Sequence, residues 1–308
     1  MAIKVLITQP LLQLQPRRPL ATPYPFACRC VQNQAIQFAI PSPPLPRFPF
    51  GQFAMPSKVQ LFVAQLPQLL PSDWASNALT LAIVIDTLRF TSTACLALQA
   101  GAKSISVAAQ VDAARQLANS LGPDTLLCGE RHCHRIEGFQ LGNSPLEYTR
   151  ETVQGRDLVF STTNGTLAVA AAVAAHQMIL AGLVNRAAVV DWIRDSQMEK
   201  VWIVCAGTDG QIAAEDVLTA GAIVSLCQQD PRCSLANDSA WIASHYFQSQ
   251  PTDRSLLTSA MTTLLTQAAG GKNLIQAGYS QDIAAVSQID LITTVPRNSA
   301  ESPMRFHA

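Results

Sequence analysis

From residue 58 onward, the chain alternates short apolar runs with helical segments, and this alternation constrains its fold more than any other feature. The apolar runs that we predict to be strands are 58–64, 80–85, 104–107, 125–128, 157–161, 178–181 and 200–205. The segments that we predict to be helices are 93–100, 111–121, 167–175, 185–195 and 213–228. Runs that are apolar on both faces suit a sheet covered by helices on both sides. The pattern therefore predicts an α/β protein, a three-layer α/β/α sandwich around a central sheet that is largely parallel or mixed.

The last third of the chain has a weaker pattern. Residues 234–268 have a helical pattern, and 289–295 form a candidate late strand. Earlier, Ser144-Pro-Leu-Glu147 predicts a helix start, because it combines a serine cap, a proline at the first helical position and a glutamate three residues after the serine.

The stretch before the alternating region has a different composition. Residues 1–54 lack Asp and Glu, are basic and are rich in proline, so we predict an extension outside a folded domain at 55–308. Three interpretations of it stay open: a disordered tail, a chain start assigned upstream of a true start at Met55, and a transit segment.

Overall composition limits the partners. Lys plus Arg and Asp plus Glu both number 21, so the formal net charge is zero, which argues against a large nucleic-acid interface. No apolar run approaches the roughly 20 residues that cross a bilayer. We therefore expect a cytoplasmic protein with a small anionic ligand and with neither a membrane nor a nucleic-acid partner. Whether it forms a homo-oligomer stays open.

Ligands of open α/β sheets bind beyond the carboxyl ends of the strands, so the residues that follow each strand are the first candidates for a site. After 80–85 come Asp86, Arg89, Thr91 and Ser92. A carboxylate can hold a hard cation, a guanidinium suits phosphate or carboxylate, and the hydroxyls open a helix whose N–H groups favour anions. Taken alone, the segment is equally typical of an ordinary helix start.

Two further strand ends repeat this chemistry. Glu130 and Arg131 follow 125–128, and Asn143 and Ser144 stand a little later in the chain. The strand at 157–161 is followed by a polar turn that would present its amides to a phosphate; it contains Thr163, Asn164, Gly165 and Thr166.

The fourth strand end adds two carboxylates. Glu215 and Asp216 stand early in the helix that follows 200–205. With Asp86 and Glu130 nearby, these two carboxylates would complete a set of oxygen ligands for Mg²⁺. The alternative is that both are ordinary acidic residues favoured by the helix dipole.

Together these segments resemble the 2-phosphosulfolactate phosphatase (ComB) family. The matching stretches stand in the family's order: IDTLRFTST (85–93), GER (129–131), IEGFQLGNSPLEY (136–148), STTNGT (161–166), CAGTDGQIAAEDVLTAGAIV (205–224) and GGKNLIQAGYSQDI (270–283). The resemblance covers essentially all of 58–296. It implies an α/β/α fold and a Mg²⁺-dependent phosphatase that hydrolyses the phosphate ester of a small 2-hydroxy acid, typified by 2-phospho-3-sulfolactate in coenzyme M biosynthesis.

The residues and the resemblance together suggest roles. We expect Asp86, Glu130 and Asp216 to hold Mg²⁺, with Asp86, Arg89 and Glu215 as catalytic residues. Whether Asp86 is a metal ligand or a covalent nucleophile stays open. The substrate-binding candidates are Arg89, Thr91, Ser92, Arg131, Asn143, Ser144, Thr163, Asn164, Gly165 and Thr166.

The chain departs from the family pattern in two places. His132 and Cys133 stand where the family usually has glycines, and Gln140 stands where it usually has Asp. These departures keep open a non-catalytic, anion-binding paralogue of the same fold. His132, Cys133 and His134 do not suit zinc, because adjacent residues close a tetrahedron poorly.

Other phosphatase classes fail on residue type. A haloacid-dehalogenase-type enzyme needs a second Asp where this chain has Leu88, and a cysteine phosphatase needs Arg where it has Gln211 or His134. The sequence has neither a Walker A loop nor a strand followed by GxGxxG.

Overall fold

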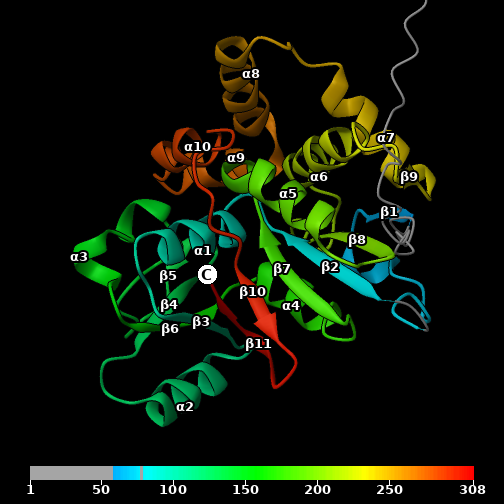
Figure 1. Ribbon diagram of the computed structural model, residues 1–308. Helices are drawn as coiled ribbons and strands as arrows, with labels where there is room; N and C mark the ends of the chain where they lie inside the picture. Colours follow the sequence, from blue (N-terminus) through cyan, green and yellow to red (C-terminus); the bar gives the residue numbers. More distant parts are fainter. Residues whose placement is uncertain (1–57, 77–78) are drawn as a thin grey trace, which may run out of the picture. The chain divides into compact units, whose positions relative to one another are not determined.

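The computed structural model describes residues 58–76 and 79–308 (Figure 1). The predicted extension at 1–54 and the alternative start at Met55 lie outside the described residues, so both stay predictions. Within the described part of the chain, no helix is both long and apolar enough to cross a membrane.

One mixed sheet forms the centre of the domain (Figure 1). Its strand order is β5–β4–β6–β3–β11–β10–β7–β2–β8–β1–β9. Neighbours within β4–β6–β3 and within β7–β2–β8–β1–β9 pair in parallel. The strands are β1 (Val59–Ala64), β2 (Thr80–Ile85), β3 (Ser104–Val107), β4 (Leu126–Arg131), β5 (His134–Arg135), β6 (Asp157–Ser161), β7 (Gln177–Ala181), β8 (Lys200–Cys205), β9 (Cys233–Leu235), β10 (Arg297–Ser299) and β11 (Ser302–His307).

The C-terminal hairpin β10–β11 joins these two parallel groups through antiparallel pairs. β10 pairs with β7, β11 pairs with β3, and the two hairpin strands pair with each other. The predicted strand at 289–295 is wrong, because this segment is an irregular connection that leads into the hairpin. The hairpin strands are short and mixed in polarity, so hydrophobic periodicity did not reveal them.

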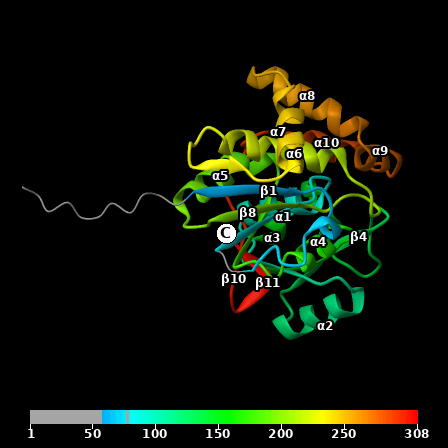
Figure 2. The same ribbon diagram turned by 90° about the vertical axis from the view of Figure 1, so that its right-hand side faces the viewer.

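Helices cover both faces of the sheet. In β2, Leu81, Ile83 and Ile85 belong to the hydrophobic core beneath α5, α6 and α7, whereas Ala82 and Val84 belong to the core shared with α1 and α4. Figure 2 shows α6, α7 and α8 on one side of the strands and α2 on the other. The helices are α1 (Phe90–Gln99), α2 (Val111–Leu121), α3 (Arg150–Val153), α4 (Gly165–Ala171), α5 (Arg186–Asp195), α6 (Ala214–Cys227), α7 (Asp238–Gln248), α8 (Arg254–Gln267), α9 (Ala269–Gln276) and α10 (Ser280–Val286).

These layers confirm the predicted three-layer α/β/α sandwich around a mixed sheet. The alternation of β2 side chains between two cores is the packing expected of a strand buried on both faces.

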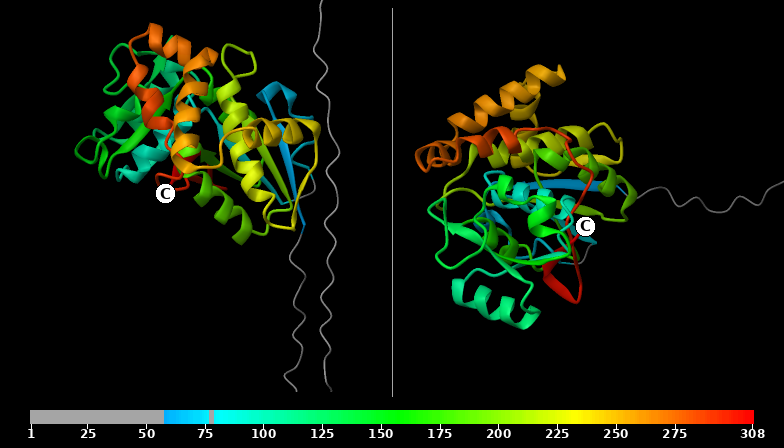
Figure 3. Two further views of the ribbon diagram at one scale, coloured as in Figure 1. Left: turned by 90° about the horizontal axis from the view of Figure 1, so that it is seen from above. Right: turned by 90° about the vertical axis from the view of Figure 1, so that its left-hand side faces the viewer.

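Helices α8, α9 and α10 add a separate hydrophobic cluster to the domain. Leu218 of α6, Met261 and Leu265 of α8, Leu274 of α9 and Ile283 of α10 form its buried centre. Figure 3 shows these three helices, in orange to red-orange, gathered at one end of the domain. The cluster matters for function because it holds α9 and α10 beside the loops that follow the strands.

The helix predicted to start at Ser144 is wrong. Residues Pro145–Glu147 form a single 3-10 turn, η2, and the Ser144 side chain caps no backbone N–H. Its hydroxyl donates instead to Oδ1 of Asp282, 2.6 Å away. A tertiary contact therefore replaces the local capping bond that the sequence motif indicated.

Candidate active site

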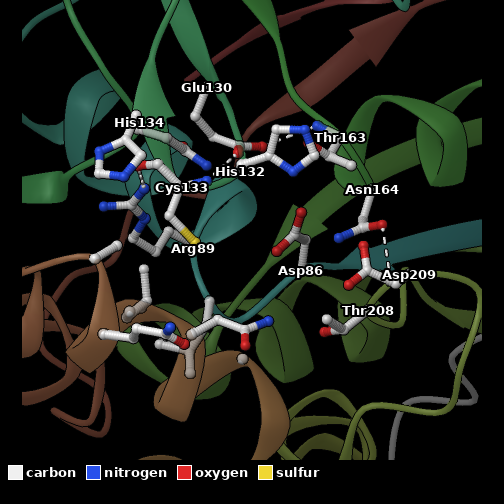
Figure 4. A pocket seen from close by; sticks show the side chains of 17 residues that line it. Asp86, Arg89, Glu130, His132, Cys133, His134, Thr163, Asn164, Thr208 and Asp209 are labelled. Atoms are coloured by element: carbon white, nitrogen blue, oxygen red, sulfur yellow. Dashed lines mark hydrogen bonds between the residues drawn. The ribbon is translucent and has the colours of Figure 1, made fainter.

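A cavity of about 500 Å³ opens where the loops after β2, β4, β6 and β8 meet α9 (Figure 4). The residues that line it are Asp86, Leu88, Arg89, Glu130, His132, Cys133, His134, Asn143, Thr163, Asn164, Thr208, Asp209, Gly270, Asn273, Leu274, Gln276 and Ala277. The four strand ends singled out in the sequence therefore contribute to one cavity. Figure 4 shows the Asp86 carboxylate in the middle of the cavity, with side chains from several loops around it.

The loop after β2 is closed by Thr91. The Asp86 N–H donates to Thr91 Oγ1 at 2.9 Å, and the Thr91 N–H donates back to the Asp86 carbonyl at 3.1 Å. Thr91 Oγ1 also donates to the carbonyl of Ala181 at the end of β7. Thr91 is fully buried and does not line the cavity, so it positions Asp86 and is not placed to contact a ligand.

Gly165 makes room for the Asp86 carboxylate. A Cβ atom at this position would lie 2.5 Å from Asp86 Oδ2 and 2.5 Å from a ring carbon of Phe90. Such a contact is far inside van der Waals distance, so any larger residue would displace one of the two side chains. The role of Gly165 that the structure shows is therefore to leave space for Asp86.

The environment of Asp86 disfavours its negative charge. Burial, followed by the nearby carboxylate of Glu130, raises the pKa of Asp86 from 3.8 to about 7. A hydrogen bond from the Phe90 N–H and the charge of Arg89 act in the opposite direction but do not compensate. The side chain is only 7% exposed. A bound cation would remove this penalty.

Glu130 connects two of the loops. Its Oε1 accepts a 2.9 Å hydrogen bond from the Thr163 N–H, and its Oε2 accepts one of 2.9 Å from the Cys133 N–H. The side chain is 8% exposed and lines the cavity. Glu130 thus holds the β6–α4 loop and the β4–β5 turn together and also presents charge to the cavity.

Arg131 points to a different region. Its guanidinium donates to the carbonyls of Glu130, Ser161 and Ala109 and to the Ser161 hydroxyl. It does not line the cavity. The structure therefore gives Arg131 a role in fixing the ends of β4 and β6 and does not bring it to a substrate.

Asp216 links the loops that follow β2 and β8 through hydrogen bonds. Its Oδ1 accepts from the Thr87 N–H at 2.8 Å, and its Oδ2 accepts from the Gly207 N–H at 3.0 Å. Burial, followed by the charges of Glu215 and Asp86, raises its pKa well above the ordinary range. Asp216 does not line the cavity, so its visible role is to hold the loop that carries Asp86.

Glu215 lies next to Asp216 and is equally buried, at 2% exposure. Burial raises its pKa. Its Oε2 has no hydrogen-bond partner within the described part of the chain. Glu215 also stays outside the cavity lining, although it packs closely against Gly270, which does line it.

Arg89 lies in a buried ionic network. Its guanidinium donates to Asp282 Oδ2 at 2.6 Å and to the Cys133 carbonyl at 2.8 Å, and it stacks on the Tyr279 ring at 4.5 Å from the centroid. Both members of the ion pair are 2% exposed. Asp282 in turn accepts from Ser144, which explains why Ser144 does not reach the cavity.

The hydroxyl groups of the remaining candidates are hydrogen-bonded to backbone carbonyls. Ser92 Oγ donates to the Thr87 carbonyl, and Thr166 Oγ1 donates to the Thr162 carbonyl. Both residues are fully buried. Of the site residues predicted from the sequence, those that line the cavity are Asp86, Arg89, Glu130, Asn143, Thr163 and Asn164.

Sequence reasoning missed several residues of the site. Asp282 was within a recognised stretch but had no adjacent polar partner in the sequence to reveal its pairing with Arg89. Asp209 lines the cavity from the turn after β8, with its N–H bonded to Asn164 Oδ1 and its φ at 51°. The available signal in the sequence was the Asp209-Gly210 dipeptide shortly after a predicted strand, because Asp-Gly favours a turn.

Within the described residues, no three His, Cys, Asp or Glu side chains form a ready-made metal-binding group. Three buried side-chain oxygens without a hydrogen-bond partner do occur there: Asn143 Oδ1, Thr163 Oγ1 and Glu215 Oε2. The first two belong to residues of the cavity wall. Buried polar atoms are normally hydrogen-bonded, so such atoms call for an explanation.

These features define a class: an α/β protein with an acidic cavity at its strand ends, suited to a small polar ligand. The chain belongs to the 2-phosphosulpholactate phosphatase family, whose model matches residues 64–301. This is a family of phosphoric monoester hydrolases.

Similar proteins come from several bacteria. A Nostoc punctiforme protein is 36% identical over 242 residues, covering 77% of this chain and 95% of that protein. A Caldanaerobacter subterraneus protein is 38% identical over 216 residues, covering 70% and 86%. A Thermotoga maritima protein is 36% identical over 215 residues, covering 70% and 87%. Each bears the name "probable 2-phosphosulfolactate phosphatase".

Proposed function

We propose that the cavity hydrolyses the phosphate ester of a small 2-hydroxy acid with the help of Mg²⁺, converting 2-phospho-3-sulfolactate to 3-sulfolactate and phosphate. The family and the names of the relatives support the substrate class. The cavity supports the metal through its charge and its unpartnered oxygen atoms.

The observation that carries the proposal is the charge of the cavity wall. Asp86, Glu130 and Asp209 contribute carboxylates to it, whereas Arg89 is paired with Asp282. A phosphate ester with a further carboxylate is itself strongly anionic, so these like charges would repel it. If these carboxylates held a divalent cation, the interaction with the anionic substrate would become attractive.

The donor set of the cavity fits Mg²⁺. This ion prefers oxygen ligands, and the residues of the cavity wall include the carboxylates of Asp86 and Glu130, the amide oxygen of Asn143 and the hydroxyl of Thr163. We propose Asp86 and Glu130 as the carboxylate ligands. Asp216, which accepts hydrogen bonds from two backbone amides, is then a positioning residue.

The bound ion would neutralise phosphate charge and favour in-line attack by water. The protein's own groups provide the rest. A guanidinium has five N–H donors, so Arg89 retains donors for the substrate beyond those bonded to Asp282 and Cys133. The Asn164 side chain faces Asp86 from the β6–α4 loop (Figure 4) and is in position to orient a phosphate oxygen.

Two mechanisms remain distinct for Asp86. As a ligand, it keeps its own atoms throughout turnover. As a nucleophile, it attacks the phosphorus and releases the alcohol, and water then attacks the phosphorus of the acyl phosphate, so that phosphate leaves and the carboxylate is regenerated. A substrate whose phosphate is made chiral with oxygen isotopes separates them: inversion at phosphorus indicates direct attack by water, and retention indicates two displacements through Asp86.

A phosphate-release assay tests the function. We expect the protein to release phosphate from 2-phospho-3-sulfolactate with Mg²⁺ and to stop when a chelator is added. Asp86→Asn should abolish release, whereas Asp112→Asn, an exposed carboxylate on α2, should not. Full activity in the presence of the chelator would refute the proposal that the reaction requires Mg²⁺. Binding of the ester without release would instead identify a non-catalytic anion-binding paralogue.

A further inference from the structure

His132, in the turn between β4 and β5, and His134, at the start of β5, lie at the wall of the cavity. His132 and His134 both line the cavity, and both side chains are exposed. Figure 4 shows both rings in the upper part of the view, with His134 above Arg89, His132 between Glu130 and Thr163, and Asp86 below. Neither ring is used by the phosphatase chemistry proposed above.

The turn that carries them is held firmly. His132 and Cys133 have φ values of 51° and 68°, in the left-handed region that favours glycine. The Cys133 N–H is bonded to Glu130 Oε2, and the Cys133 carbonyl accepts from Arg89. The His134 ring packs 6.1 Å from the Tyr279 ring. The backbone that carries the two imidazoles is thus fixed relative to Glu130 and Arg89.

Helix α9 supplies polar groups to the same cavity. Asn273 and Gln276 line it and are exposed. Within residues 58–76 and 79–308, no hydrogen bond occupies the amide groups of these two side chains or the His132 and His134 rings. An imidazole always donates at least one N–H and an amide donates two, so this part of the cavity offers several free donors.

We propose that His132 and His134 determine specificity by donating hydrogen bonds to an anionic group on the part of the substrate that is not released as phosphate. This inference rests on the proposed function and names the residues that recognise the substrate's sulfonate or carboxylate. Asp86 and Glu130 would then hold the phosphate through Mg²⁺, and the two imidazoles, assisted by Asn273, would hold the second anionic group.

Steady-state kinetics with graded substrates tests the inference. The substrates are 2-phospho-3-sulfolactate, 2-phospholactate, which lacks the sulfonate, and propan-2-yl phosphate, which lacks both acidic groups. The variants are His132→Gly, which suits the turn, His134→Ala and the double variant. His176→Ala, an exposed imidazole that does not line the cavity, is the matched control.

We expect the double variant to raise KM for 2-phospho-3-sulfolactate about tenfold or more, with kcat nearly unchanged, because a lost hydrogen bond to a charged group weakens ground and transition states alike. KM for propan-2-yl phosphate should not change. His132→Asn, which tolerates the left-handed conformation and keeps an N–H donor, should recover most of the loss in the His132→Gly protein. An equal loss with all three substrates, or no loss, would overturn the inference.

Binding of the product separates this inference from the proposed function. Calorimetry of 3-sulfolactate requires no turnover, and the double variant should bind it about tenfold more weakly than the unaltered protein and the His176→Ala control. If the protein releases no phosphate from any ester, the proposed function fails, but this measurement still decides the role of the histidines. Equal binding by all three proteins would refute that role.

Discussion

The buried carboxyl of Asp86 makes a prediction that separates function from stability. We expect Asp86→Asn to abolish phosphate release and yet to make the metal-free protein more stable at neutral pH. The amide has nearly the same shape as the carboxyl, and its oxygen can accept the same hydrogen bond from the Phe90 N–H. It carries no charge, so it avoids both the burial penalty and the repulsion from Glu130.

The magnitude and sign follow from the pKa of Asp86, which rises from 3.8 to about 7 on folding. Each pKa unit is worth roughly 1.36 kcal/mol, so ionised Asp86 costs the folded protein about 4 kcal/mol. Because the folded pKa is the higher one, the unaltered protein loses stability as pH rises from about 4 to about 7. The variant has no such loss, so its advantage should grow from about 1.5 kcal/mol at pH 5 to about 4 kcal/mol above pH 7.

Urea denaturation at pH 5, 6, 7 and 8 in the presence of a chelator measures this difference. Asp209→Asn is the matched control, because that side chain is exposed at the same cavity, and we expect it to change the unfolding free energy by no more than about 0.5 kcal/mol. Added Mg²⁺ should stabilise the unaltered protein by about 2.7 kcal/mol at 100 times its Kd and leave Asp86→Asn unchanged. A stability difference that is constant between pH 5 and pH 8 would refute the reasoning.

Two further variants test the groups around the cavity. Gly165→Ala should lower the unfolding free energy by about 1–3 kcal/mol and should lower activity tenfold or more, because the new methyl group displaces Asp86. A normal kcat in this variant would show that the close approach of Gly165 to Asp86 is not needed for catalysis. Asp282→Ala should cost about 3–5 kcal/mol by urea denaturation, because it leaves the buried charge of Arg89 unpaired. Asp290→Ala, which removes a more exposed ion pair, should cost clearly less, and equal losses would show that burial does not matter here.

Much of the fold was predictable from local sequence. The predicted strands at 80–85, 104–107, 157–161 and 200–205 have the bounds found in the structure, and so does the helix at 111–121. The strands are short, mostly apolar runs and the helix is an amphipathic repeat, so both patterns are visible without tertiary information. The predictions of a late strand at 289–295 and of a helix start at Ser144 were wrong, because long-range contacts determine the structure of these segments.

The candidate site was likewise predictable from the sequence only in part. The rule that ligands bind beyond strand ends identified Asp86, Glu130, Thr163 and Asn164, all of which line one cavity. The rule also selected Thr91, whose hydroxyl is hydrogen-bonded to the backbone of Asp86 and Ala181. Residue type and position alone do not distinguish a hydroxyl that faces a cavity from one that holds a loop.

The sequence by itself determined the class of fold, the family and the loops that carry the site, because apolar periodicity and ordered motifs are properties of the chain. Only the tertiary structure decided which side chains face the cavity. Arg89 meets Asp282 across 193 residues of chain, and Asp216 reaches Thr87 across 129. A polar group's role depends on the partner that satisfies it, and here packing brings those partners from distant elements.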